Sequence, residues 1–210
     1  MRDEVEPFER KRITKHIHTA LENITNLKSA LITVLNHIKK LTDCEAVAIR
    51  LHNNDGDYPY YVYDGFSKSF ILHENSLCSK NSAGKRILSP DGDGYILDCM
   101  CGNVIRGRFD SSLTFFTKNG SFWTNNTSAL LATTTEEERQ SRTRNYCNSC
   151  GYESVALIPL KVRGERIGLL QLNDMRKGMF NEELIEYLET VVVEKIGLAA
   201  QKCLSRPTKN

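Results

Sequence analysis

The chain has 210 residues, of which 40% are hydrophobic and 26% charged, and its formal net charge is +2. This length suits one domain with additional helices, and the composition is that of an ordinary globular protein. A nearly neutral chain lacks the basic face of a nucleic-acid-binding protein, so we expect no nucleic-acid partner. Apolar runs are all shorter than the ~18 residues of a membrane span, and the N-terminus has no apolar signal segment. We therefore expect no membrane insertion and a cytoplasmic location.

One long helix is predicted over about residues 8–42. Its apolar residues follow steps of three and four: Ile17, Ala20, Ile24, Leu27, Leu31, Val34, Ile38 and Leu41. A seam of more than three heptads is typical of a coiled coil. At ~1.5 Å per residue the helix would be about 50 Å long, so we expect part of it to pack on a second copy of the chain. The alternative is that the stripe covers the chain's own sheet.

Short strands are predicted next. Residues 45–51 (EAVAIRL) alternate, Asp55-Gly56 is a strong hairpin signal, and residues 58–63 form the returning strand. Residues 70–72 and 95–97 are predicted as further short strands. The rest of the segment 74–126 has the composition of irregular loops.

The last third of the chain carries the clearest pattern. Thr135–Glu138 has the spacing of a capping box, and Arg139, Arg142 and Arg144 follow it, which predicts a short helix. Residues 153–174 predict two strands around a polar turn at 161–166. Asn181 then begins an amphipathic helix that runs to about residue 203, and residues 204–210 are predicted to be a frayed tail.

This order of elements resembles a GAF domain over residues 25–203, with residues 1–24 as the N-terminal part of a signalling helix. The words CMCGNV, GSFWTN and GYESVALIPL are similar to the cysteine-rich GAF domains of bacterial and archaeal sensor histidine kinases. The resemblance implies an α/β (α+β) fold with a GAF/PAS-like central antiparallel sheet of about six strands. Long N- and C-terminal helices would flank one face of this sheet, and pocket-covering loops would flank the other.

Five of the seven cysteines are candidate metal ligands. Two close pairs, with a possible fifth ligand upstream, comprise Cys99, Cys101, Cys147, Cys150 and Cys78. Four thiolates on two loops suit zinc or an iron–sulfur cluster. The same residues allow a disulfide switch, attachment of a tetrapyrrole through one cysteine, or an inert role as small buried hydrophobes.

The resemblance also implies a ligand pocket that residues 95–125 cover. The residues expected to line it are Phe109, Phe115, Phe116, Phe122 and Trp123, with Arg106, Arg108 and Asn125 as polar groups. The alternative is that the aromatic residues close a secondary core and that the arginines are solvated.

We expect a sensor rather than an enzyme, because no phosphate-binding or hydrolase motif occurs in the sequence. The sensor would bind a small ligand, metal centre or tetrapyrrole. It would form a homodimer through residues 17–41 and 184–203 and relay the signal to a partner protein through these helices. The alternatives are a cysteine-based redox enzyme, similar to a methionine sulfoxide reductase, and a structural dimerisation module.

Overall fold

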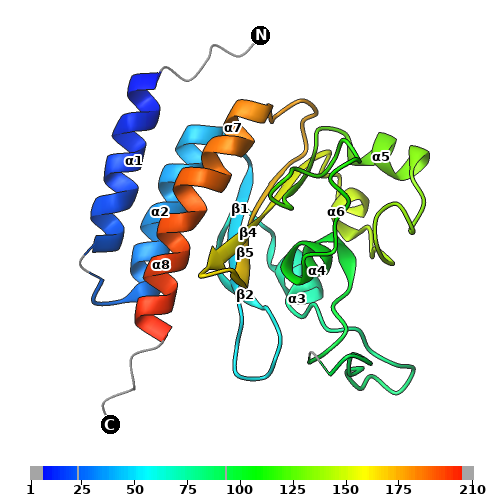
Figure 1. Ribbon diagram of the computed structural model, residues 1–210. Helices are drawn as coiled ribbons and strands as arrows, with labels where there is room; N and C mark the ends of the chain where they lie inside the picture. Colours follow the sequence, from blue (N-terminus) through cyan, green and yellow to red (C-terminus); the bar gives the residue numbers. More distant parts are fainter. Residues whose placement is uncertain (1–6, 23, 93, 205–210) are drawn as a thin grey trace.

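The computed structural model describes residues 7–22, 24–92 and 94–204. Helices cover one face of a central sheet, and short helices and loops cover the other (Figure 1). Apart from residue 204, the predicted tail lies outside the described residues, as do residues 1–6 of the predicted N-terminal segment 1–24 and residue 23 of the predicted first helix. In chain order the elements are α1 (Pro7–Glu22), α2 (Leu27–Thr42), β1 (Ala46–Leu51), β2 (Tyr60–Asp64), α3 (Lys68–Glu74), α4 (Cys99–Arg106), β3 (Phe122–Thr124), α5 (Thr127–Thr133), α6 (Tyr146–Ser149), β4 (Ser154–Val162), β5 (Glu165–Asp174), α7 (Glu182–Tyr187), η1 (Leu188–Val192) and α8 (Val193–Leu204).

The five strands form one antiparallel sheet in the order β2-β1-β5-β4-β3, close to the predicted six. The predicted hairpin over residues 153–174 is confirmed as β4 and β5. Its two-residue loop is Arg163-Gly164, with φ of 51° and 86°. Two left-handed residues in succession are typical of a tight turn whose twist matches that of the strands. The loop therefore sets the pairing of Val162 with Glu165 and of Lys161 with Arg166, and a bulge between Leu160 and Lys161 shifts the register of the rest of the hairpin.

Side-chain alternation divides the interior into two layers. On β1, Val47 and Ile49 face a core shared with α2 and α8, whereas Ala46 and Ala48 face a second core beneath the loops. β4 alternates in the same way: Ala156 and Ile158 face the helix-covered core and Val155 and Leu157 face the other, because successive strand residues point to opposite faces. The predicted amphipathic C-terminal helix is confirmed as α7, η1 and α8, and the Asn181 side chain caps it by accepting a hydrogen bond from the Leu184 amide.

The prediction of one helix over residues 8–42 is wrong. The chain breaks between α1 and α2, where the Asn26 side chain caps α2 by accepting a hydrogen bond from the Ser29 amide. α1 lies against α2 and α8 (Figure 1), and its Thr14 hydroxyl is 2.7 Å from the Tyr187 hydroxyl. Ile17 and Leu31, both members of the predicted seam, are buried within the single chain. The stripe therefore does not require a second copy, and the homodimer stays a prediction.

Three other local predictions need correction. Residues 70–72 belong to helix α3, because Ser67 caps it by accepting a hydrogen bond from the Phe70 amide. The capping box of Thr135 and Glu138 forms, but only turns follow it, since Gln140 adopts a φ of 67° and ends any helical path. Residues 95–97 make isolated bridges to Leu88 and Cys78 rather than a strand.

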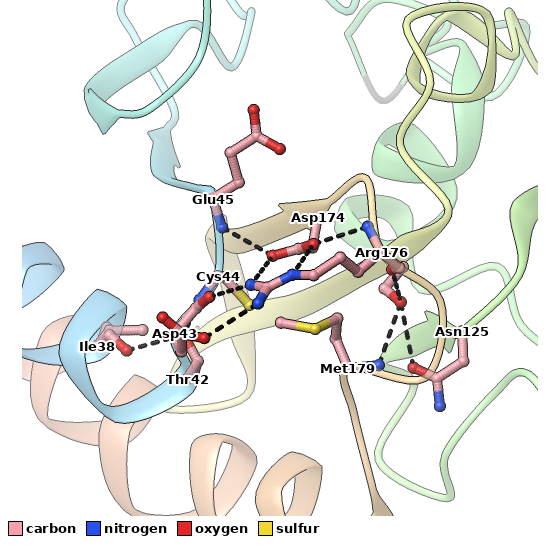
Figure 2. A network of polar contacts seen from close by, with 10 residues as sticks. Ile38, Thr42, Asp43, Cys44, Glu45, Asn125, Asp174, Arg176 and Met179 are labelled. Atoms are coloured by element: carbon pink, nitrogen blue, oxygen red, sulfur yellow. Dashed lines mark hydrogen bonds and ion pairs between the residues drawn. The ribbon is translucent and has the colours of Figure 1, made fainter. Parts of the chain in front are cut away.

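A polar network ties the end of α2 to the end of β5 (Figure 2). Asp174 ends β5, Asp43 follows α2, and Arg176 pairs with both carboxylates. Beside it, the Asn125 side chain accepts a hydrogen bond from the Phe180 amide and donates one to the Phe180 carbonyl. The network thus fixes where the chain leaves the sheet for α7. Among the described residues, none of the helices combines the length and apolar character required to cross a membrane.

Candidate functional site

A cavity of about 60 Å³ lies on the loop-covered face of the sheet. We call it the thiol cavity. Strands β3 and β4 form its floor, and α4, α5, α6 and the segment before α6 form its walls. Its lining residues are Cys99, Met100, Cys101, Phe122, Thr127, Leu130, Leu131, Arg139, Thr143, Asn145, Tyr146, Cys147, Asn148, Val155 and Leu157.

Three cysteines from two distant segments meet at this cavity. Cys99 and Cys101 lie in the first turn of α4, and Cys147 lies in α6. Burial raises the pKa of Cys99, and it raises the pKa of Cys101 to about 12. Burial, together with the two α4 cysteines, raises the pKa of Cys147 well above its usual value. The three side chains are therefore neutral thiols at pH 7 in the protein as it stands.

The remaining candidate ligands lie elsewhere. Cys150 does not line the thiol cavity, and Cys78 lies beside Asp57 and lines a separate surface pocket. Burial and then the Asp57 charge raise the pKa of Cys78 to about 11. Within residues 7–22, 24–92 and 94–204, no group of three or more His, Cys, Asp or Glu side chains is arranged to hold a metal ion. A metal centre at these cysteines stays a prediction.

Hydrogen bonds from α4 hold the wall segment 139–145 in place. The buried Asn103 side chain donates to the Arg139 carbonyl at 2.6 Å and accepts from the Ser141 hydroxyl at 2.8 Å. Three non-glycine residues in and beside this wall have positive φ: Cys99 at 66°, Gln140 at 67° and Asn145 at 57°. Backbone conformations of this kind cost free energy and concentrate at binding and catalytic sites.

Two polar side chains in the wall lack partners for one of their polar atoms. Arg139 and Thr143 are 6% and 8% exposed. Arg139 Nη1 donates to the carbonyl and hydroxyl of Thr134, whereas Arg139 Nε and Thr143 Oγ1 have no hydrogen-bond partner among the described residues. The sequence indicates Arg139 only as a charge near a helix end, and no local signal reveals that its side chain is buried.

A second polar group adjoins the thiols on the same face of the sheet. The fully buried Arg50 donates to the carbonyls of Tyr58, Glu74 and Asn75, and its guanidinium carbon lies 3.5 Å from the centre of the Tyr60 ring. Because these bonds go to backbone carbonyls, Arg50 joins β1 to β2 and α3. We infer a structural role for it.

The predicted aromatic residues divide between two layers. Phe122 lines the thiol cavity. Phe109, Phe115 and Phe116 pack on one another in the layer beneath the loops, with Phe115 and Phe116 ring centres 5.0 Å apart. Trp123 packs against the core of the terminal helices, on the opposite face of the sheet. Phe109, Phe115 and Phe116 therefore belong to a secondary core beneath the loops, which was the alternative to a pocket lining.

The predicted polar residues bind backbone groups. Arg106 donates to the Tyr95 carbonyl at 3.0 Å, and Arg108 donates to the Leu97 carbonyl at 2.9 Å. Asn125 accepts a hydrogen bond from the Ser154 hydroxyl in the network of Figure 2 and lies outside the thiol cavity. These side chains hold the loops over the sheet.

Comparison with known proteins agrees with this architecture. The family model described as GAF domain matches residues 26–199. The GAF domain of a phosphoenolpyruvate-protein phosphotransferase from Coxiella burnetii is similar, with a TM-score of 0.61 at 15% identity over 95% of this chain and 98% of that one. A free methionine-R-sulfoxide reductase from Neisseria meningitidis, in complex with its substrate, gives 0.59 at 13% identity over 97% and 98%.

A domain assigned to a two-component sensor histidine kinase from Sinorhizobium meliloti gives a TM-score of 0.55 at 14% identity, over 87% of this chain and 95% of that one. At these identities the likeness concerns the fold alone. No curated protein matches the sequence.

Proposed function

Because this chain belongs to the GAF domain family, we propose that it is a sensory domain that binds a small ligand in the thiol cavity. One observation carries the proposal: short helices and loops leave a mostly apolar, half-open cavity on this face of the sheet, bordered by strained backbone. Concave, mostly apolar cavities are typical of ligand sites. At about 60 Å³ the cavity is far below the several hundred Å³ of cofactor sites, which favours a small ligand over a tetrapyrrole.

The route from the cavity to the terminal helices is short. α6 lines the cavity and leads directly into β4, and β4 packs against α8. A Cβ atom on Gly197 of α8 would lie 2.9 Å from the Lys161 carbonyl oxygen of β4, so the two backbones are in close contact. We propose that occupancy of the cavity shifts β4 and thereby the terminal helices, which pass the signal to a second copy or a partner protein.

The first experiment is purification without oxygen, followed by a visible spectrum, zinc and iron analysis, and a thermal-shift screen of small molecules. Leu130→Trp on α5 fills the cavity, and Ala132→Trp on the exposed side of the same helix is its control. We expect ligands that raise the melting temperature of the wild type and of Ala132→Trp but not of Leu130→Trp. Equal shifts in both variants would place binding elsewhere, and no shift with any compound would favour a structural dimerisation module.

A second candidate is a cysteine-based redox enzyme, and the meeting of Cys99, Cys101 and Cys147 at one cavity favours it. In that reaction two thiols would be oxidised to a disulfide while a sulfoxide is reduced to a thioether and water. The raised thiol pKa values weigh against this candidate, since the thiolate is the nucleophile. Turnover of methionine sulfoxide with a thiol reductant, abolished by Cys→Ser at one of these positions, would establish it.

A further inference from the structure

We propose that the protein binds a phosphate monoester at a second site, where Arg166 and Lys161 hold the phosphoryl group. This site is an open pocket beside the β4–β5 hairpin, which we call the cation pocket. Its lining residues come from the segment after β1, from α4 and from the hairpin: His52, Tyr58, Ile105, Arg106, Lys161, Gly164, Glu165, Arg166 and Ile167. Among the described residues, the cation pocket and the thiol cavity have no lining residue in common. The inference therefore does not depend on the proposed sensory function.

Arg166 is a cation that the fold positions without a counter-charge. Gly107 and Gly120 border its guanidinium group: a Cβ atom at Gly107 would collide with Nη1, and one at Gly120 would lie 2.8 Å from Nη2. The guanidinium carbon lies 5.5 Å from the centre of the Phe109 ring. No hydrogen bond or ion pair joins Arg166 to another described residue, and burial alone lowers its pKa. Because a partly buried cation is costly without an anion, this arrangement favours an anionic ligand.

The guanidinium nitrogens of Arg166 are accessible to solvent. They have no hydrogen-bond partner among the described residues, and yet none of them is among the buried polar atoms that lack a partner, unlike Nε of Arg50 and of Arg139. Nitrogens that lack a partner and are not buried retain accessible surface, and Arg166 lines the cation pocket. A guanidinium presents N–H groups in a fixed plane, which match two oxygens of a phosphate.

Lys161 supplies the second positive charge at this pocket. Its Nζ donates one hydrogen bond to the Asn119 carbonyl at 2.6 Å, so two of its three N–H groups remain for a ligand. Burial lowers the pKa of Lys161, and the charge of Arg166 lowers it further, although Glu189 acts in the opposite direction. This repulsion means that the two cations are near enough to act on one anion.

The charge of the lining favours a dianion. Three cations, Arg106, Lys161 and Arg166, line the pocket together with one carboxylate, Glu165. A phosphate monoester carries nearly two negative charges at pH 7 and has three acceptor oxygens, so it can engage the guanidinium and the ammonium group together. A carboxylate has one charge and two oxygens, and it would leave one of the two cations unmatched.

The rest of the lining favours an ester over free phosphate. The exposed ring of His52 lies 5.0 Å from that of Tyr58, centre to centre, and the partly exposed Ile167 lines the same pocket. Aromatic and apolar surfaces of this kind pack against an organic group, which inorganic phosphate lacks.

The test is isothermal titration calorimetry with phenyl phosphate in about 150 mM sodium chloride, which screens long-range attraction between exposed charges. Sodium phosphate is the control without the ring, and sodium benzoate is the control without the phosphoryl group. We expect phenyl phosphate to bind at least about tenfold more tightly than either control. Equal binding of phosphate would make the ligand inorganic phosphate, and equal binding of benzoate would make it a monoanion. Either result, or no binding of phenyl phosphate, would overturn the inference.

Variants then locate the site. Arg166→Gln should raise the Kd for phenyl phosphate about tenfold or more, and Lys161→Gln should raise it as well. Arg163→Gln removes the same charge from the exposed turn of the same hairpin and should leave the Kd within about twofold of the wild type. Unchanged binding by Arg166→Gln, or an equal loss in Arg163→Gln, would overturn the inference.

Two further measurements separate binding from folding and from the thiol cavity. Ligand-free Arg166→Gln should melt no lower than the wild type, because it loses a partly buried cation that has no partner. Lower melting with unchanged binding would show that Arg166 is structural. Leu130→Trp, which fills the thiol cavity, should bind phenyl phosphate as the wild type does. Loss of binding in that variant would place the phosphate ester in the thiol cavity and overturn the second site, while leaving the proposed sensory function intact.

Discussion

The Arg176 guanidinium donates two hydrogen bonds to the Asp174 carboxylate, from Nε at 2.9 Å and from Nη2 at 2.8 Å. Asp174 is buried at the end of β5, and its carboxylate also accepts the backbone amide of Glu45 at 3.0 Å. Arg176 continues to Asp43 after α2 (Figure 2). Through Arg176, the end of β5 is thus joined to the end of α2, close to the point where the chain leaves the sheet for α7.

We expect Arg176→Gln to lower the free energy of unfolding by about 1.5 kcal/mol. The variant removes charge-assisted hydrogen bonds to a buried carboxylate, although half of the arginine side chain is exposed to solvent. Urea unfolding at pH 7 measures the change. Lys68→Gln, on the exposed side of α3, is the control and should stay within about 0.5 kcal/mol of the wild type. Equal stabilities of the two variants would show that the pair contributes nothing.

The same carboxylate predicts a pH dependence. Burial by itself would raise the pKa of Asp174, but hydrogen bonds from Arg176 and Glu45 outweigh it, so the pKa lies below its usual value. The ionised form therefore stabilises the folded state fully above the unfolded pKa of about 4. This stabilisation is lost as the pH falls through the lower folded pKa. The stability gap between wild type and Asp174→Asn should be constant from pH 7 to 5 and narrow below pH 4. A constant gap at low pH would refute this.

The cavity thiols should be unreactive in the folded protein. With the pKa of Cys101 raised to about 12, its thiolate fraction at pH 8 is very small. Iodoacetamide labelling followed by peptide mass spectrometry should show Cys99 and Cys101, which are both buried, reacting at least about a hundredfold more slowly in buffer than in urea. Cys203, partly exposed on α8, is the internal reference. Rapid native labelling would instead support the redox enzyme, and acceleration by a chelator would indicate a bound metal.

Gly197→Ala should destabilise the protein by about 1 kcal/mol, the reverse of the usual effect in a helix. Alanine normally favours a helix over glycine, but here its methyl group would collide with the Lys161 carbonyl. Thermal unfolding measures the sign. Leu198→Ala, on the exposed side of α8, serves as the control. A more stable Gly197→Ala would show that α8 and β4 can separate freely, which would weaken the proposed relay.

The homodimer is best tested at exposed apolar residues of the terminal helices. Ile32 on α2 and Leu198 on α8 are 45% and 55% exposed. We expect the wild type to be a dimer and the double variant Ile32→Glu/Leu198→Glu to be a monomer with an unchanged fold, as measured by light scattering and circular dichroism. A double variant that remains dimeric would exclude this surface.

Leu31→Asp gives the matching buried variant. Leu31 is fully buried inside one chain, so an aspartate there should unfold the domain, by about 4 kcal/mol or more, rather than separate two copies. If this variant instead stays folded and is a monomer, the result would support the predicted dimer contact through residues 17–41.

Local chemistry was sufficient for much of the fold. The hairpin of β4 and β5 follows from alternating apolar residues and the Arg163-Gly164 turn, and the last helix follows from its cap at Asn181 and its periodicity. Both signals lie within a few residues of the structure that they specify. The sequence does not reveal the break before α2, because the apolar pattern continues without interruption past the Asn26 cap. The same apolar stripe suits two helices that fold back on each other as well as one continuous helix.

The candidate site was decided by tertiary contacts. The sequence singled out Cys99, Cys101 and Cys147, but only the fold places α4 and α6 at one cavity, whose lining leaves Cys150 out. Arg139 resembles any surface arginine in sequence. It turns inward because Asn103 and Thr134 bind its segment and side chain. Composition and periodicity report on neighbours along the chain, whereas a cavity is a relation between residues that only folding makes neighbours.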